Sequence, residues 1–75
     1  MKFKGDLEFS ELEKHGFKPK YDEDNGSINR YSYGFEEIVK IYVKTRKISV
    51  THDSGFAHVI AEVIYKITKA GLLED

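Results

Sequence analysis

The chain contains no cysteine, a single proline and no long hydrophobic run. Without cysteine it lacks the disulfide bonds that stabilise many small secreted domains, and no apolar signal segment follows its first residues, so we expect a cytoplasmic protein. Its apolar runs extend over only a few residues, whereas a membrane span needs about 18 or more. We find no internal repeat and no linker rich in proline, glycine or serine, which predicts a single domain over residues 1–75.

Neither sign of charge is in excess. Lysine and arginine number 12 against 13 aspartate and glutamate, and the formal net charge is -1, so total charge does not favour nucleic acid as a partner. Hydrophobic residues make up 40% of the chain, which is enough for a core and argues against disorder. Five tyrosines and five phenylalanines are many for a chain that can bury only about 60% of its surface, and a homodimer is therefore expected.

Residues 56–70 carry the clearest pattern. Apolar residues recur there at steps of three and four, which predicts a long amphipathic helix. The apolar stripe consists of Phe56, Val59, Ile60, Val63, Ile67 and Ala70. Asp53 or Ser54 is expected to cap its start. Gly71 is expected to end it in the left-handed conformation, with Leu72 folding back on Ile67.

Two segments before this helix alternate with a period of two, which predicts a hairpin. Residues 38–44 and 47–51 are its strands, and the predicted register pairs Val43 with Ile48 and Ile41 with Val50 around a turn at 45–46. The C-terminal helix is expected to pack on the apolar face of this hairpin. The other face carries the residues that a nucleic acid could contact, Lys40, Tyr42, Lys44 and Lys47, with Arg46 at the turn.

An earlier hairpin is predicted around the turn 22–27, because Asn-Gly supplies the positive φ angles of a tight turn. It joins residues 17–21 to 28–33, in a register that pairs Tyr21 with Tyr31 and Phe17 with Phe35. Pro19 donates no ladder hydrogen bond, so the first strand is expected at a sheet edge.

The N-terminal segment predicts a short helix from about Leu7 or Glu11 to His15, because Ser10 and Glu13 have the capping-box spacing. The predicted fold class is thus α+β. It consists of a short N-terminal helix, a three- or four-stranded antiparallel meander sheet and a long C-terminal amphipathic helix packed on one sheet face.

Three groups of residues resemble known sites, and each has a simpler explanation. A calcium loop aligned on Gly26 would end at Ser32 where glutamate is required, so a solvated turn is predicted. Residues 51–54 include the residue types of a hydrolase catalytic triad. The members of a triad, however, come from separate parts of a chain and meet in space, and adjacent residues cannot easily present that arrangement. His58 and Glu62, with His52 nearby, could share a zinc ion, but an i,i+4 pair is ordinary helix-surface electrostatics.

The order αβββα over about 70 residues is similar to that of double-stranded-RNA-binding domains. Those domains carry lysines at the start of the last helix, where this chain reads Phe56-Ala57-His58-Val59. Residues 12–17, the strands rich in tyrosine and isoleucine, and the ending 70–73 resemble the layout of small uncharacterised proteins of phages and prophages of Gram-positive bacteria. This resemblance implies an accessory protein and assigns no functional residue.

The leading hypothesis is a non-enzymatic interaction module that presents aromatic residues to a protein partner or to a second copy. The candidate interaction surface consists of Tyr31, Tyr33, Phe35 and Tyr65. The alternative is a weak nucleic-acid-binding domain that uses Lys40, Tyr42, Lys44, Arg46 and Lys47. No catalytic residue, metal, cofactor, small-molecule substrate or membrane contact is predicted, because the titratable groups lack paired spacing and no long pocket-forming loop is evident.

Overall fold

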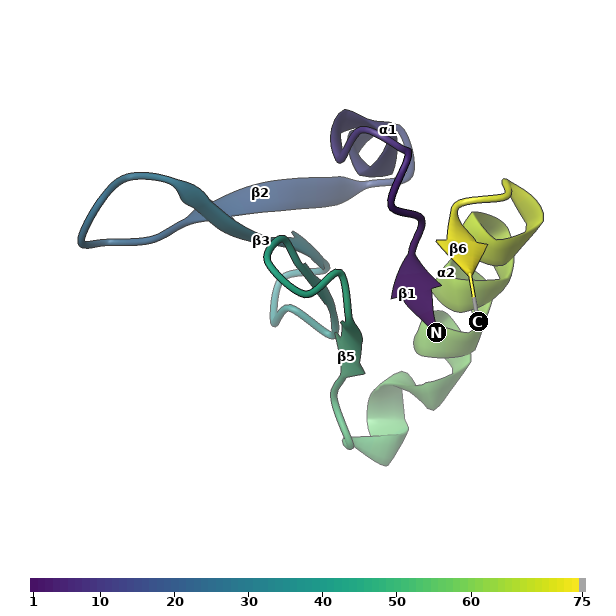
Figure 1. Cartoon of the computed structure of the whole chain (residues 1–75). Coiled ribbons are helices and arrows are strands. Elements are labelled where there is room, and N and C mark those ends of the chain that lie inside the picture. The colour runs from purple at the N-terminus through teal and green to yellow at the C-terminus, as the bar shows by residue number, and fades with distance from the viewer. Residues whose placement is uncertain (75) are drawn as a thin grey trace.

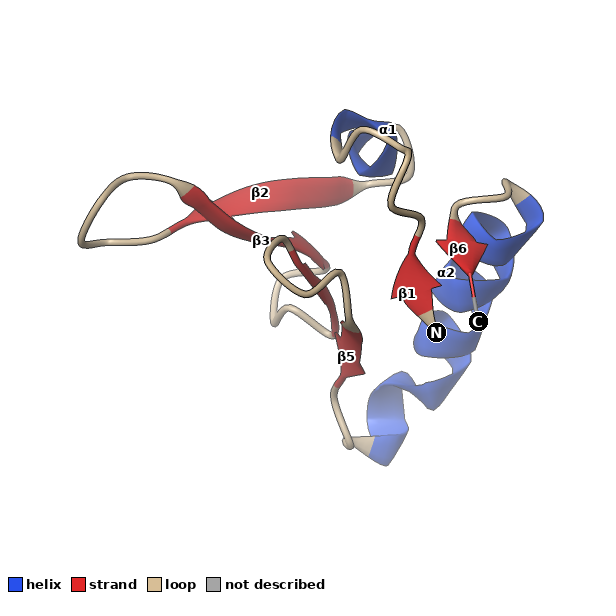
Figure 2. Ribbon diagram, in the orientation of Figure 1, coloured by secondary structure: helices blue, strands red, loops and turns tan. Residues whose placement is uncertain are grey.

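The computed structural model describes residues 1–74 and is mostly sheet (Figures 1 and 2). Its elements in chain order are β1 (Lys2–Phe3), α1 (Ser10–Glu13), β2 (Phe17–Tyr21), β3 (Ile28–Tyr33), β4 (Val39–Tyr42), β5 (Ile48–Val50), the 3-10 turn η1 (Ser54–Phe56), α2 (Ala57–Lys69) and β6 (Leu73–Glu74). Strands β2, β3, β4 and β5 form an antiparallel meander in that order, and β1 pairs with β6 in a second, two-stranded antiparallel sheet.

The two sheets are joined through β1. Lys2 forms an isolated antiparallel bridge with Lys47, just before β5, and the Phe3 N–H donates to the Arg46 carbonyl over 2.9 Å. On the other side, the Lys4 N–H donates to the Leu72 carbonyl over 2.9 Å, so β1 lies between the meander and the C-terminal strand. Both ends of the chain therefore meet beside α2, as Figure 1 shows.

The predicted fold class is wrong in its parts, although the structure is α+β. There are two sheets where one was predicted, the order is not αβββα, and only the C-terminal segment forms a helix of more than one turn. The expected N-terminal helix is the single turn α1. Its N-cap is Phe9 without a side-chain hydrogen bond, so the capping box between Ser10 and Glu13 is also wrong.

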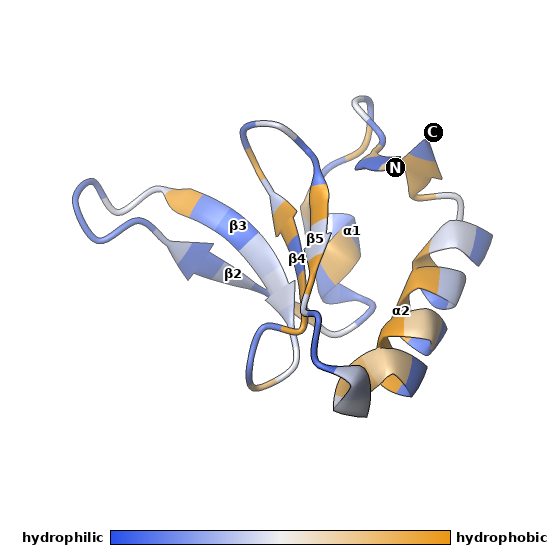
Figure 3. Ribbon diagram, turned by 90° about the horizontal axis from the view of Figure 1, so that it is seen from below, coloured by the Kyte–Doolittle hydropathy of each residue, from blue (hydrophilic) through white to orange (hydrophobic). Residues whose placement is uncertain are grey.

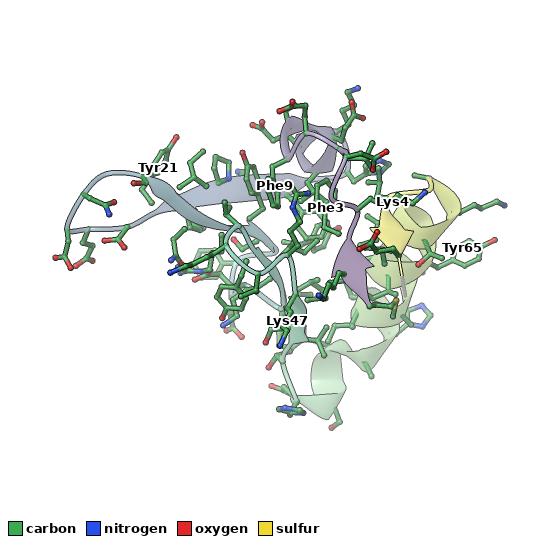
Figure 4. The ribbon with its side chains drawn as sticks, in the orientation of Figure 1. Phe3, Lys4, Phe9, Tyr21, Lys47 and Tyr65 are labelled. Atoms are coloured by element: carbon green, nitrogen blue, oxygen red, sulfur yellow. The ribbon has the colours of Figure 1, made fainter. Side chains whose placement is uncertain are left out.

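Packing of aromatic rings explains why the N-terminal segment does not extend into a longer helix. The Phe9 ring stacks on Phe3 at a centroid distance of 4.8 Å and on Tyr31 at 5.4 Å. An isolated helix this short is marginal in water, so such tertiary contacts override its local preference. Figure 4 shows Phe3 and Phe9 together between β1 and β2.

Both predicted hairpin registers are wrong, the second by two residues and the first by two residues before its bulge and by three after it. Phe17 pairs with Tyr33, not Phe35, and a bulge follows at 20–21. Ile41 pairs with Ile48, not Val50. The second connection is longer than predicted and contains Arg46 in the left-handed region, at φ 61°. A slip of two leaves a side chain on its predicted face, because strand side chains alternate with a period of two, and this holds for the second hairpin and for the first up to Lys20.

The core lies between the four-stranded sheet, the N-terminal segment and α2. Its fully or nearly fully buried apolar residues are Phe3, Leu12, Phe17, Tyr31, Ile38, Val39, Ile41, Val63, Ile67 and Leu72. Figure 3 shows the hydrophobic residues of α2 on the side that faces β4 and β5. Only Val63 and Ile67 of that helix are buried, whereas Val59 remains partly exposed.

The ends of the C-terminal helical segment agree with their predictions. The Asp53 carboxylate accepts a hydrogen bond from the Gly55 N–H over 2.9 Å at the start of η1. Gly71 has φ 78°, and the Leu72 N–H donates to the Ile67 carbonyl over 3.1 Å, which is the Schellman motif. Within residues 1–74, no helix is both long enough and apolar enough to cross a membrane.

Candidate binding surface

On the face of the meander that lies opposite the core side chains, every charged residue that the strands contribute is basic. Strand alternation and the observed pairs place seven residues on this open face: Lys18, Lys20, Arg30, Ser32, Lys40, Tyr42 and Ser49. Every charged residue within β2, β3, β4 and β5 is a lysine or arginine, and all of them lie here. A chain of net charge -1 therefore concentrates positive charge on one surface.

A row of cations crosses this surface from strand to strand. Lys20 pairs with Arg30, and Arg30 pairs with Tyr42. The Tyr42 N–H donates to the Lys47 carbonyl over 3.1 Å, and Lys47 is bridged to Lys2. Neighbouring strands lie about 4.8 Å apart, so the row places four cations around one aromatic ring over roughly 20 Å. We call these five residues the transverse row.

Within residues 1–74, one carboxylate, that of Glu37, forms a salt bridge with this row, and Glu74 of β6 is the register partner of Lys2. Arg30 donates from Nε to Glu37 Oε1 over 2.6 Å and from Nη2 to Oε2 over 3.0 Å, a bidentate pair whose side chains are 27% and 29% exposed. The hydrogen bond from Arg30 lowers the pKa of Glu37 below its usual value, and the nearby Lys20 and Lys40 act in the same direction. Glu37 holds this position with φ 52°, a conformation that is costly for a residue with a Cβ.

A concavity adjoins the row at the β3–β4 loop. Its lining consists of Gly16, Lys18, Lys20, Ser32, Tyr33, Gly34 and Phe35. Two lysines supply positive charge, and Ser32, which also lines the concavity, is buried. The Phe35 side chain at its rim is fully exposed, at 104%. Gly34 shapes the loop, because its φ of 86° is one that residues with side chains rarely adopt.

The residues of the predicted nucleic-acid face do not all lie together. Lys40 and Tyr42 lie on the open face, Lys47 continues the transverse row, and Lys44 is exposed in the β4–β5 turn. Arg46 instead turns to the N-terminal segment, where its guanidinium donates to the carbonyls of Lys4 and Leu7. Lys2, Lys18, Lys20 and Arg30 were not part of the predicted face. For Lys18 and Lys20, the alternation with Pro19 in β2 indicates that the two lysines lie on the same face of the strand.

The predicted aromatic surface is divided between the core and two separate elements. Tyr31 is buried, which raises the pKa of its hydroxyl, and its ring stacks on Phe9. Tyr33 is half-buried beside Phe17, at a ring centroid distance of 5.5 Å. Phe35 is exposed on the β3–β4 loop. Tyr65 is 62% exposed on α2 and points away from the rest of the chain (Figure 4).

The remaining candidates have local structural roles. Asp53 caps η1, and His52 is exposed. His58 Nε2 lies 3.2 Å from Glu62 Oε1 on the surface of α2. Among residues 1–74, no three histidine, aspartate or glutamate side chains gather as a metal site would require. Asn25 holds its turn by accepting hydrogen bonds from the backbone and hydroxyl of Ser27.

Comparison with known proteins finds no family model, no curated protein and no solved structure that matches this chain. The resemblance in layout to small phage and prophage proteins therefore stays a prediction.

Proposed function

We propose that this protein is a non-enzymatic binding module that holds single-stranded nucleic acid on the open face of its meander sheet. The observation that carries the proposal is the charge of the four strands, in which every ionisable side chain except tyrosine is basic and lies on one face. When a polyanion binds such a surface, the cations of the protein replace counterions that were condensed on the polyanion. The favourable free energy of this release depends on the local density of cations and not on the net charge of the chain.

The aromatic residue in the transverse row favours a nucleic acid over other polyanions. Tyr42 lies between Arg30 and Lys47 and is half-buried. Single-stranded nucleic acids bind where cations follow the backbone and aromatic rings stack on bases. The carboxylates of an acidic peptide could pair with the cations, but such a peptide has no base to stack on the Tyr42 ring.

The other hypothesis, an aromatic surface for a protein partner, has less support because its residues are dispersed. Tyr31 is buried, and Phe35 and Tyr65 lie on different elements. Its homodimer component stays a prediction, which light scattering at high protein concentration tests directly: a monomer there rules it out.

Binding of a fluorescently labelled single-stranded oligonucleotide, followed by anisotropy at several salt concentrations, tests the proposal. The affinity is expected to fall with salt, at a slope of about -0.7 per phosphate contacted. The double variant Lys20→Gln/Lys47→Gln is expected to bind weakly with a shallower slope. Lys66→Gln/Lys69→Gln on α2 is the matched control, since it removes the same charge from exposed positions elsewhere.

Two results would overturn the proposal. One is equal loss of affinity in both double variants, because net charge alone would then govern binding. The other is competition by polyglutamate as strong as that by unlabelled oligonucleotide, which would assign the surface to acidic proteins.

A further inference from the structure

We infer that the concavity beside Phe35 is a nucleotide subsite, in which the base of one nucleotide stacks on the Phe35 ring while Lys18 and Lys20 contact its phosphate. The inference rests on the proposed function and adds to it the place where one base is held. It follows from three features of the β3–β4 loop and the end of β2.

The first feature is the exposure of Phe35. A phenylalanine with its whole side chain in water contributes nothing to the core, and full burial of such a side chain is favourable by about 1.5–3 kcal/mol. The loop that carries it contains two residues at positive φ, Gly34 and Glu37. Glu37 is in turn fixed to β3 by its bidentate contact with Arg30. The loop is thus anchored at the sheet while its aromatic ring projects outward.

The second feature is the chemistry of the lining. Lys18 and Lys20 come from one strand, two residues apart, so both lie on the open face, and both line the concavity that Phe35 also lines. An aromatic rim beside two ammonium groups matches a base joined to a phosphate, since the base supplies a flat π surface and the phosphate supplies the charge. A neutral apolar ligand would leave both lysines without a partner.

The third feature is continuity with the transverse row. Lys20 lines the concavity and is also the first residue of the row. A nucleotide held at Phe35 can therefore continue, through its sugar-phosphate backbone, toward Arg30 and Tyr42. From this continuity we expect the subsite to bind a nucleotide that is part of a nucleic-acid strand and not a free nucleotide.

Anisotropy with two labelled strands of the same length tests the inference, one carrying bases and one abasic throughout. Phe35→Ala is expected to weaken binding of the base-carrying strand about 5- to 140-fold, the equivalent of about 1–3 kcal/mol at 1.4 kcal/mol per tenfold. It is expected to leave the abasic strand unaffected. Phe35→Trp should retain or strengthen binding, and Tyr65→Ala on α2, the matched aromatic control, should change neither strand.

The failures of the two proposals are distinguishable. If the unaltered protein binds the base-carrying strand and Phe35→Ala binds it equally well, the subsite is wrong and the proposed function stands. An equal loss for both strands also contradicts the subsite, because stacking would then not be involved. Competition by adenosine monophosphate as strong as that by the strand would reassign the concavity to free nucleotides. If the unaltered protein binds neither strand, the proposed function fails and the subsite fails with it.

Discussion

The guanidinium carbon of Arg46 lies 4.5 Å from the centroid of the Phe9 ring. Phe9 directly precedes α1 and Arg46 lies in the β4–β5 turn, and the same guanidinium donates to the Lys4 carbonyl, 42 residues away in sequence. A cation over an aromatic face is favourable by about 0.5–2 kcal/mol, and hydrogen bonds from charged donors add to this. Arg46 thus ties the N-terminal segment to the β4–β5 turn.

Arg46→Lys is expected to lower the free energy of unfolding by about 1–3 kcal/mol, because an ammonium group cannot stack flat on Phe9 and reach both carbonyls. Lysine has the same conformational cost as arginine at the positive φ of this position. The difference in stability therefore reports the contacts of the Arg46 side chain alone. Urea denaturation measures the change. Lys44→Ala in the same turn is the control, with an expected change below about 0.5 kcal/mol. An equal effect of both substitutions would contradict this role of Arg46.

Gly71→Ala is expected to destabilise the protein by about 1 kcal/mol, because Gly71 ends α2 with φ 78°. An added Cβ would meet no atom within 4 Å, so the cost comes from the backbone alone. Gly5→Ala is matched in having free space around its Cβ, but Gly5 has no positive φ, and no loss of stability is expected there. Thermal unfolding of both variants measures the difference, and equal stability would contradict the Schellman cap.

The local signals in the sequence were enough to predict this helix end, and the alternation of β4 and β5 was enough to predict which side chains share a face. The exact pairing was wrong in both hairpins because a shift of two residues leaves the hydrophobic pattern unchanged. Turn geometry decides between such registers, and nothing in the sequence around Arg46 signalled its left-handed conformation.

Contacts between distant segments could not be predicted. β1 and β6 have two residues each and stand at opposite ends of the chain, so neither shows a period. Arg46 was assigned to the open face from its place in a basic segment, whereas the carbonyls of Lys4 and Leu7 and the ring of Phe9 draw it to the other side. By contrast, Lys18 and Lys20 alternate visibly, and pairing of β2 with β3 places them on the face of Lys40.

Glu37→Gln is expected to strengthen binding of single-stranded nucleic acid, because it frees Arg30 to contact a phosphate. The slope of log affinity against log salt is expected to steepen by about 0.7, the value for one more phosphate. Glu36→Gln, an exposed neighbour outside the contact with Arg30, makes the same change in net charge and is the control. If both variants change the slope equally, Glu37 does not compete for Arg30.

The same ion pair predicts a pH dependence of stability. Because the pKa of Glu37 is lower in the folded state than its usual value of 4.5, the pair stabilises the fold fully above that pH. The stabilisation is lost as the pH falls through the lowered pKa. The difference in free energy of unfolding between the unaltered protein and Glu37→Gln, about 1 kcal/mol at pH 7, should therefore shrink toward zero in acid. Urea denaturation between pH 7 and pH 3 measures it, and a difference that persists unchanged at pH 3 would contradict the pair's contribution.

The most direct measurement is the mapping of amide chemical shifts by NMR while a single-stranded oligonucleotide is added to the isotope-labelled chain. The account predicts that the largest shifts fall on β2, β3 and β4, above all at Lys20, Arg30 and Tyr42, and that they diminish as salt is added. Shifts confined to α2 around Tyr65, or no shifts in low salt at any residue of the sheet, would contradict it.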